Sequence, residues 1–141
     1  MSREFLLPVR VYIEDTDAGG IVYYVNYLKY FERARTEFMR TIGYEKAAFL
    51  GGDALFVVTD VAIRYRQSAR LDDLLQVSAD VHAVGAATIA FAQKVYREGC
   101  CLAEGTVTIA LIAADTARPK RLPKSLRTAL VSESSEKQYS H

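Results

Sequence analysis

One amphipathic helical segment, flanked by segments that alternate like strands, most constrains the fold of this chain. Apolar side chains recur at three- and four-residue steps from Tyr27 to Ile42, which is the spacing of one helix face. Asn26 is a good N-cap residue before this segment, and Gly43 suits the position just past a helix end. At about 1.5 Å per residue the helix would be roughly 24 Å long, so we expect it to lie across a whole sheet.

Segments with the period of two that marks half-buried strands lie on both sides of this helix. One precedes it at Val9–Ile13, where three branched apolar residues alternate with polar ones. Four follow it after short turns and cover residues 57–65, 77–83, 89–95 and 107–111. Such short connections join antiparallel neighbours. We expect a second short helical stretch at 45–50 and only strands and their connections after it.

This order of elements predicts an α+β domain in which a long helix packs on an antiparallel sheet. One helix cannot cover both faces of such a sheet, so we expect a second copy of the chain to cover or extend it, giving a homo-oligomer. The 141 residues fit one domain, which we place at 1–131. The polar segment 132–141 has no apolar period, and we expect it to be disordered.

Charge and cysteine content exclude several classes of function. The chain has 18 Lys and Arg against 17 Asp and Glu, a balance that argues against a nucleic-acid or membrane-surface binder. No apolar stretch approaches the length of a membrane span, so we expect no membrane insertion. The adjacent Cys100 and Cys101 form neither a disulfide framework nor a zinc-ligand pattern. We expect them to be buried thiols of a cytoplasmic protein without a bound metal.

The densest group of candidate functional residues is segment 14–24, between the first strand and the helix. Three carboxylates, Glu14, Asp15 and Asp17, precede a pair of glycines. Glycines let main-chain N–H groups approach a ligand closely. A carboxylate beside such groups could attack a substrate or activate water while the N–H groups hold a developing oxyanion.

Simpler interpretations of this segment remain open from the residues alone. Asp15 and Asp17 could merely cap a turn. A calcium-binding loop that begins at Asp15 would need an oxygen ligand and a glutamate where the chain has Gly19 and Asn26. An aspartyl-phosphate phosphatase would need a parallel α/β sheet, which this order of elements does not give.

Residues 9–23, Tyr27 and the helical run Glu-Arg-Ala-Arg-Thr-Glu at 32–37 closely resemble the active-site region of the 4-hydroxybenzoyl-CoA thioesterase family. Within that family they look most like the YbgC-type acyl-CoA thioesterases associated with the Tol–Pal cell-envelope system. Weaker similarity at 69–73 and 122–125 extends the resemblance over most of the chain. It implies a hotdog fold, in which a curved antiparallel sheet wraps a long central helix. It also implies no cofactor and an active site at a subunit interface, within a dimer or a dimer of dimers.

The implied activity is hydrolysis of acyl-CoA thioesters, and of acyl carrier protein thioesters as a further option. The resemblance assigns Asp17 as the catalytic carboxylate and a main-chain N–H near Tyr24 as the donor to the thioester oxygen. Asp17 could attack the carbonyl to form a mixed anhydride, or act as general base on water. Asp15 is expected to hold the loop. The residues expected to contact substrate are Gly20, Val22, Tyr23, Arg66 and Arg70.

Two positions depart from the family pattern, and one alternative function stays open. Tyr24 stands where close relatives often have histidine, and Ser68 stands where a proline is usual. The alternative is a non-catalytic protein of the same fold that binds acyl thioesters or an envelope complex. Release of free thiol from a panel of acyl-CoA substrates would separate the two functions.

Overall fold

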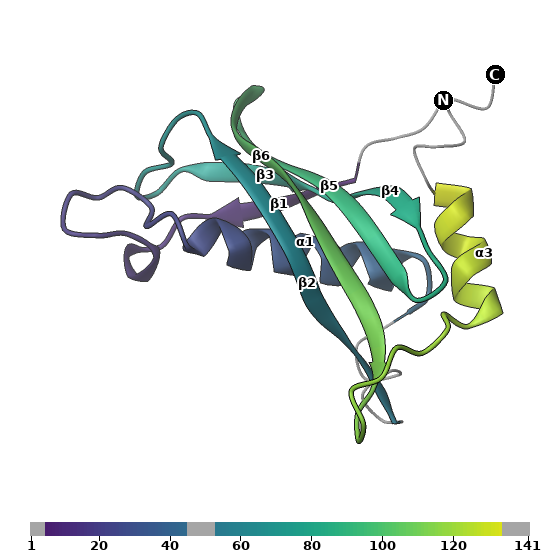
Figure 1. The fold of residues 1–141 in the computed structure, drawn as a ribbon. Helices are drawn as coiled ribbons and strands as arrows, with labels where there is room; N and C mark the ends of the chain where they lie inside the picture. The colour runs from purple at the N-terminus through teal and green to yellow at the C-terminus, as the bar shows by residue number, and fades with distance from the viewer. Residues whose placement is uncertain (1–4, 45–52, 134–141) are drawn as a thin grey trace.

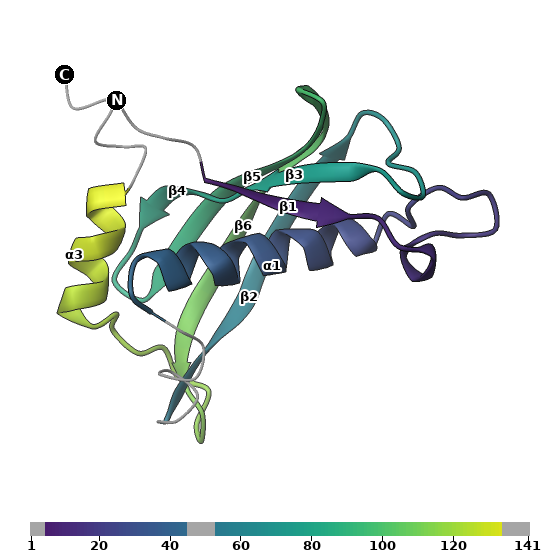
Figure 2. The same cartoon turned by 180° about the vertical axis from the view of Figure 1, so that it is seen from behind.

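A long helix lies across one face of a six-stranded antiparallel sheet, as Figure 2 shows from the helix side. The computed structural model describes residues 5–44 and 53–133. The elements in chain order are β1 (Leu6–Arg10), a 3-10 turn (Ile13–Asp15), α1 (Asn26–Thr41), β2 (Ala54–Tyr65), β3 (Leu74–Ser78), β4 (Asp80–Val84), β5 (Thr88–Arg97), β6 (Cys100–Ala113) and α3 (Lys124–Glu133). The arrangement confirms the α+β class predicted from the sequence.

The strand order places β2 at one edge of the sheet. Neighbours run β1-β3-β5-β6-β2, and β4 pairs with β5 outside this path. Among the described strands β2 pairs with β6 alone, along nearly its whole length. Figure 1 shows α3 beside β4 at one end of the molecule and the loop between β1 and α1 at the other end.

The apolar face of α1 forms the centre of the core, because its side chains recur at helical spacing. Tyr30, Phe31 and Ala34 have no exposed surface. The ring of Phe38 meets that of Phe91 on β5 edge to face, with 5.9 Å between centroids. Each large side chain buried between α1 and the sheet contributes roughly 1.5–3 kcal/mol. The packing of α1 on the sheet is therefore the main source of stability.

The two ends of α1 differ in how well the sequence predicted them. Gly43 lies just past the helix with a φ of 92°, and the N–H groups of Gly43 and Tyr44 bond carbonyls of the last turn. The predicted N-cap role of Asn26 is wrong, since Asn26 is the first residue of α1 and Val25 is the N-cap. The buried Asn26 side chain instead donates to the main-chain oxygen of Asp15 at 2.7 Å.

Two predicted strands differ from those in the structure. The first strand ends at Arg10, and Ile13, expected to point inward, is 76% exposed in the 3-10 turn. The chain turns there because the Asp15 carboxylate accepts the Tyr12 N–H. The strand predicted at 77–83 is interrupted at Ala79, which separates β3 from β4.

The C-terminal helix α3 was not predicted, because the segment after 51 was interpreted as strands alone. Leu126 and Leu130, one helical turn apart, are both fully buried on it. It ends at Glu133, two residues into the expected polar tail. Positions 134–141, and the predicted helix at 45–50, lie outside the described residues. Within the described ranges no helix combines the length and apolar character needed to cross a membrane.

The expectation of buried thiols is wrong for Cys100. Its side chain is exposed at the start of β6, and Cys101 is only partly covered. The Gln67 amide donates to the Cys100 sulfur at 3.4 Å. Adjacent residues on a strand face opposite sides of the sheet, so the two sulfurs do not share one environment.

Candidate active site

The loop between β1 and α1 is anchored through Asp15, whose side chain is 4% exposed. One carboxylate oxygen accepts the Tyr12 N–H at 2.9 Å. The main-chain oxygen of Asp15 accepts both the Asn26 amide at 2.7 Å and the Tyr23 N–H at 3.0 Å. These bonds tie both ends of the loop to the start of α1. They support the predicted loop-holding role of Asp15.

Tyr30 lies beneath this anchor and was not singled out from the sequence. Tyr30 has no exposed surface, and among the described residues its hydroxyl is the one buried side-chain nitrogen or oxygen without a hydrogen bond. Burial, and then the neighbouring Asp15 carboxylate, raise the pKa of Tyr30. Tyr30 therefore stays protonated and keeps its hydrogen available to Asp15.

Asp17, the predicted catalytic residue, lies at the exposed tip of the loop. Its Oδ1 accepts the Gly19 N–H at 2.9 Å, which is a common turn interaction of aspartate. Its main-chain N–H donates to the Ile21 oxygen, and its oxygen accepts the Gly20 N–H, both at 3.0 Å. Gly20 has a φ of 76°, a conformation that glycine adopts without strain. The tight turn leaves the carboxylate open to solvent, where it can meet a substrate.

The main-chain N–H of Tyr24 has no hydrogen-bond acceptor among the described residues, and the same is true of Val25. Both groups lie at the N-terminal end of α1, where the helix dipole adds partial positive charge. Free N–H groups at a helix N-terminus stabilise a nearby negative charge. Tyr24 therefore has the free N–H that its predicted role requires.

A cleft of about 240 Å³ opens beside Tyr24. Aromatic rings from three elements form one wall, since the Tyr65 ring packs edge to face on Tyr24 at 6.0 Å and on Tyr27 at 5.3 Å. The Tyr65 hydroxyl also donates to the Tyr24 main-chain oxygen at 3.3 Å. The lining residues are Val22, Tyr24, Tyr27, Tyr65, Arg66, Gln67 and Ser68.

The segment after β2 forms another part of the cleft wall and is bonded to the candidate catalytic loop. The Ala69 oxygen accepts the Val22 N–H at 2.8 Å, and the Ala69 N–H donates to the Tyr27 hydroxyl at 2.9 Å. Ile21 and Arg70 form an isolated bridge. Ser68, the departure from the usual proline, lies in this wall with an exposed side chain.

An ion pair fixes the far end of this wall. Arg97 Nη1 lies 2.7 Å from Asp73 Oδ2 and also donates to the Ser68 oxygen at 3.2 Å. The same Asp73 oxygen accepts the Arg70 N–H at 2.8 Å. Burial alone would raise the pKa of Asp73, but the bonds from Arg97 and Arg70 outweigh it and hold that pKa below its usual range.

Replacing Arg97 with glutamine should lower stability and make it less sensitive to acid. Because the folded-state pKa of Asp73 lies below its unfolded value, the pair stabilises the fold fully above about pH 4 and less as pH falls through the folded-state pKa. We expect Arg97→Gln to lose about 1–2 kcal/mol of unfolding free energy at neutral pH, and to show a shallower decline below about pH 4. Urea unfolding between acid and neutral pH measures both effects.

Arg66→Gln serves as the control at neutral pH, because the Arg66–Glu104 pair is more exposed, at 47% and 35%, than the Arg97–Asp73 pair, at 26% and 21%. Solvent screens an exposed ion pair of this kind, so this variant should leave the unfolding free energy nearly unchanged. Parallel pH curves for wild type and Arg97→Gln would contradict the assignment.

The structure brings only some of the predicted substrate contacts together. Val22, Tyr24 and Arg66 line the cleft. Gly20, Tyr23 and Arg70 do not line it, and neither does Asp17. The Gly20 N–H is bonded within the turn, to the Asp17 oxygen. Tyr23 is exposed and its ring packs against that of Tyr24, and Arg70 is exposed beside the loop. Within one chain, then, the carboxylate and the cleft are neighbours along the same loop without sharing one cavity.

Sequence reasoning missed Tyr65 and Gln67, which complete the cleft. Tyr65 was interpreted only as part of an alternating strand, and Gln67 follows that strand without any motif. Their contribution depends on where β2 ends relative to α1. The alternation of apolar residues does not specify that relation.

The chain is similar to known thioesterases over nearly its whole length. It matches the family model of the thioesterase-like superfamily over residues 11–130. The acyl-CoA thioesterase YbgC of Haemophilus influenzae is 45% identical over 130 residues, which cover 92% of this chain and 96% of that protein. The acyl-CoA thioester hydrolase YbgC of Escherichia coli O157:H7 is 37% identical over 123 residues, covering 86% and 92%.

A solved structure supports the same grouping. The crystal structure of a probable thioesterase from Bartonella henselae superposes with a TM-score of 0.79 at 33% identity, covering 86% of this chain and 100% of that one. The predicted similarity to acyl-CoA thioesterases and the predicted hotdog arrangement are confirmed. The chain therefore belongs to the thioesterase-like superfamily and has its hotdog fold.

Proposed function

We propose that this protein is a thioesterase that hydrolyses acyl-CoA to the free acid and CoA, with Asp17 as its catalytic carboxylate. One observation carries the proposal. The exposed Asp17 carboxylate lies on the same short loop as the Tyr24 main-chain N–H, which has no acceptor among the described residues. Hydrolysis of a thioester needs these two groups, one to attack or to activate water and one to hold the oxyanion.

In the proposed reaction the Tyr24 N–H donates to the thioester oxygen, and this bond strengthens as negative charge develops there. One such donor is worth roughly 3 kcal/mol of barrier. Asp17 either attacks the carbonyl carbon and expels the CoA thiolate, leaving an anhydride that water cleaves, or removes a proton from the attacking water. Tyr24 contributes its main chain, so the replacement of histidine by tyrosine at this position leaves the oxyanion donor in place.

A second copy of the chain is part of the proposal, since Asp17 and the cleft do not share a cavity within one copy. The edge strand β2 carries exposed apolar side chains, with Val58 at 50%, Val61 at 45% and Tyr65 at 43%. Exposed Val25 and Leu28 at the start of α1 are also apolar. An apolar edge strand favours pairing with another strand, and a homodimer through β2 would cover it and close the site around Asp17.

The substrate contacts that remain proposals are Gly20, Val22, Tyr23, Arg66 and Arg70. Val22 and Arg66 are supported by their place in the cleft wall. Arg70 is supported by its bridge to the loop at Ile21. Acyl carrier protein thioesters as alternative substrates, and a cytoplasmic location, also stay predictions.

Hydrolysis of a panel of acyl-CoA substrates tests the proposed function. Purified protein should release free thiol from at least one of short, long and aromatic acyl-CoA, followed with a thiol-reactive dye. The rate should scale with protein concentration and should resist a chelator, since the residues assigned to the reaction include no metal ligand set. Absence of thiol release from every substrate would favour the non-catalytic binding protein instead.

A further inference from the structure

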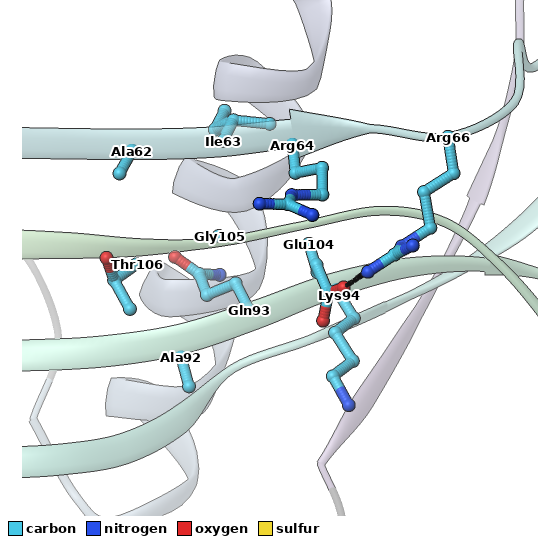
Figure 3. Close-up of a pocket in the computed structure, with 10 residues that line it drawn as sticks. All are labelled: Ala62, Ile63, Arg64, Arg66, Ala92, Gln93, Lys94, Glu104, Gly105 and Thr106. Carbon is cyan, nitrogen blue, oxygen red and sulfur yellow. Dashed lines mark hydrogen bonds and ion pairs between the residues drawn. The ribbon is translucent and has the colours of Figure 1, made fainter.

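A hollow of about 530 Å³ lies on the outer face of the sheet, opposite α1. Phe91, Gln93 and Val95 of β5 are buried toward the helix, so the alternating residues Ala92 and Lys94 face outward. Figure 3 shows the side chains that line the hollow across β5, β6 and β2.

Two cross-strand rows make up this surface. Ala92, Thr106 and Ala62 are register partners on three neighbouring strands and form a row of small side chains. The next row consists of Lys94, Glu104 and Arg64. The hollow therefore has a floor of small side chains beside a charged rim.

The rim carries more positive than negative charge. Glu104 is bonded to Arg66, and this bond holds the pKa of Glu104 below its usual range. Arg64 and Lys94 have no hydrogen bond or ion pair from their side chains among the described residues. One carboxylate thus faces three cations, and two of those cations are available to a ligand.

A fourth cation lies on the inner side of the same sheet. Arg35 of α1 is 9% exposed, and its guanidinium donates to Gln93 Oε1 at 3.0 Å. Gln93, whose side chain has no exposed surface, is held by donation to the main-chain oxygens of Phe31 and Ser78. No carboxylate in the described ranges forms an ion pair with Arg35; its guanidinium is solvated by the neutral Gln93 amide, and the charge of Glu32 on the same helix acts on it from farther away. A charge in a low-dielectric interior acts over a longer distance than one in water.

Arg66 connects the hollow to the candidate active site, because it lines both the hollow and the cleft beside Tyr24. We propose that the outer hollow binds the phosphate groups of the substrate's nucleotide, with Arg64 and Lys94 as the main contacts. The inference rests on the proposed function. A CoA thioester would enter the cleft with its acyl end and pass around the end of β2 at Arg66. Arg and Lys are the side chains suited to phosphate, and the small side chains leave room for the attached base.

The test compares two thioesters with the same acyl group, acyl-CoA and acyl-pantetheine, on wild type and on the double variant Arg64→Gln/Lys94→Gln. The double variant should raise the KM for acyl-CoA about tenfold and leave kcat within about twofold. Acyl-pantetheine carries no nucleotide, so its kcat/KM should not change. Lys124→Gln, which removes an exposed charge on α3, should leave both substrates unaffected.

Inhibition separates the nucleotide from a free anion. Adenosine 3′,5′-bisphosphate should inhibit acyl-CoA hydrolysis by wild type at least tenfold more strongly than by the double variant. Equal inhibition by inorganic phosphate would assign the hollow to free anions and overturn the proposal. An unchanged KM for acyl-CoA in the double variant would also overturn it while leaving the proposed function intact. If wild type cleaves neither thioester, the proposed function itself fails.

Discussion

Replacing Asp17 with asparagine should lower kcat for acyl-CoA hydrolysis by about 10²–10⁴-fold, the contribution typical of a positioned acid–base group. Asparagine keeps the size of the side chain and its carbonyl oxygen, so the bond from the Gly19 N–H can persist. Because the residue is exposed, the unfolding free energy should stay within about 0.5 kcal/mol of wild type. A loss of turnover in a stable protein would then report chemistry and not folding.

Glu14→Gln provides the matched control for this variant. Glu14 is an exposed carboxylate three positions earlier, in the 3-10 turn, and its replacement removes the same charge from the same loop. It should retain wild-type turnover within about threefold, as expected for a surface change away from the reacting atoms. Steady-state kinetics on one good acyl-CoA substrate, with melting curves for each protein, measure the difference. Wild-type turnover in Asp17→Asn would remove Asp17 from the mechanism.

The sequence indicated which loop carries this candidate carboxylate, but it did not indicate the cleft beside that loop. Asp17 and the Tyr24 N–H belong to one short loop, and the motif that carries them is contiguous. The cleft beside them depends on Tyr65 and Arg66, more than 40 positions later along the chain. Bringing such segments together is a property of the sheet register, which a periodic pattern does not specify.

Strand registers also explain where the predicted faces differ from the structure. The alternation of β2 was interpreted as regular, but the pairing with β6 shifts between Val58 and Asp60. The extra residue puts Val58 and Val61 on one face, although an uninterrupted strand would place them on opposite faces. No residue in this stretch is a clear signal for a bulge. By contrast, the helix α3 has a signal in Leu126 and Leu130, and the strand pattern before it led to the wrong interpretation.

Among the buried polar groups, too, the local hydrogen bonds could be predicted from the sequence and the long-range ones could not. Asp15 was expected to hold the loop because aspartate commonly does so next to a turn, and its bonds to Tyr12 support that role. The pairing of Arg35 with Gln93 joins residues 58 positions apart and could not be inferred from either neighbourhood. Hydrogen bonds between residues close in the chain can be predicted from the sequence around them. Contacts between distant segments can be identified only once the fold is known.

Gly105→Ala should be the most destabilising glycine-to-alanine change in the sheet, because an added Cβ on β6 would run into the main chain of β2. A Cβ at position 105 would overlap the main-chain oxygen of Ala62 and lie 3.0 Å from the Cα of Ile63. Both neighbours are backbone in the middle of a paired strand, so neither can rotate away. The strands would have to separate, and overpacking of this kind costs about 3 kcal/mol.

For a domain of this size that loss corresponds to a fall in melting temperature of roughly 10 °C, measurable by circular dichroism. Gly19→Ala is the control, since its Cβ would meet only Asp17 Oδ1, at an ordinary 3.5 Å. Its melting temperature should stay within about 3 °C of wild type. Gly105→Ala should also weaken acyl-CoA hydrolysis, because a displaced β2 carries Tyr65 and the following Arg66 away from Tyr24. An unchanged melting temperature would mean that β2 can shift at no cost, and would contradict the predicted clash between the two strands.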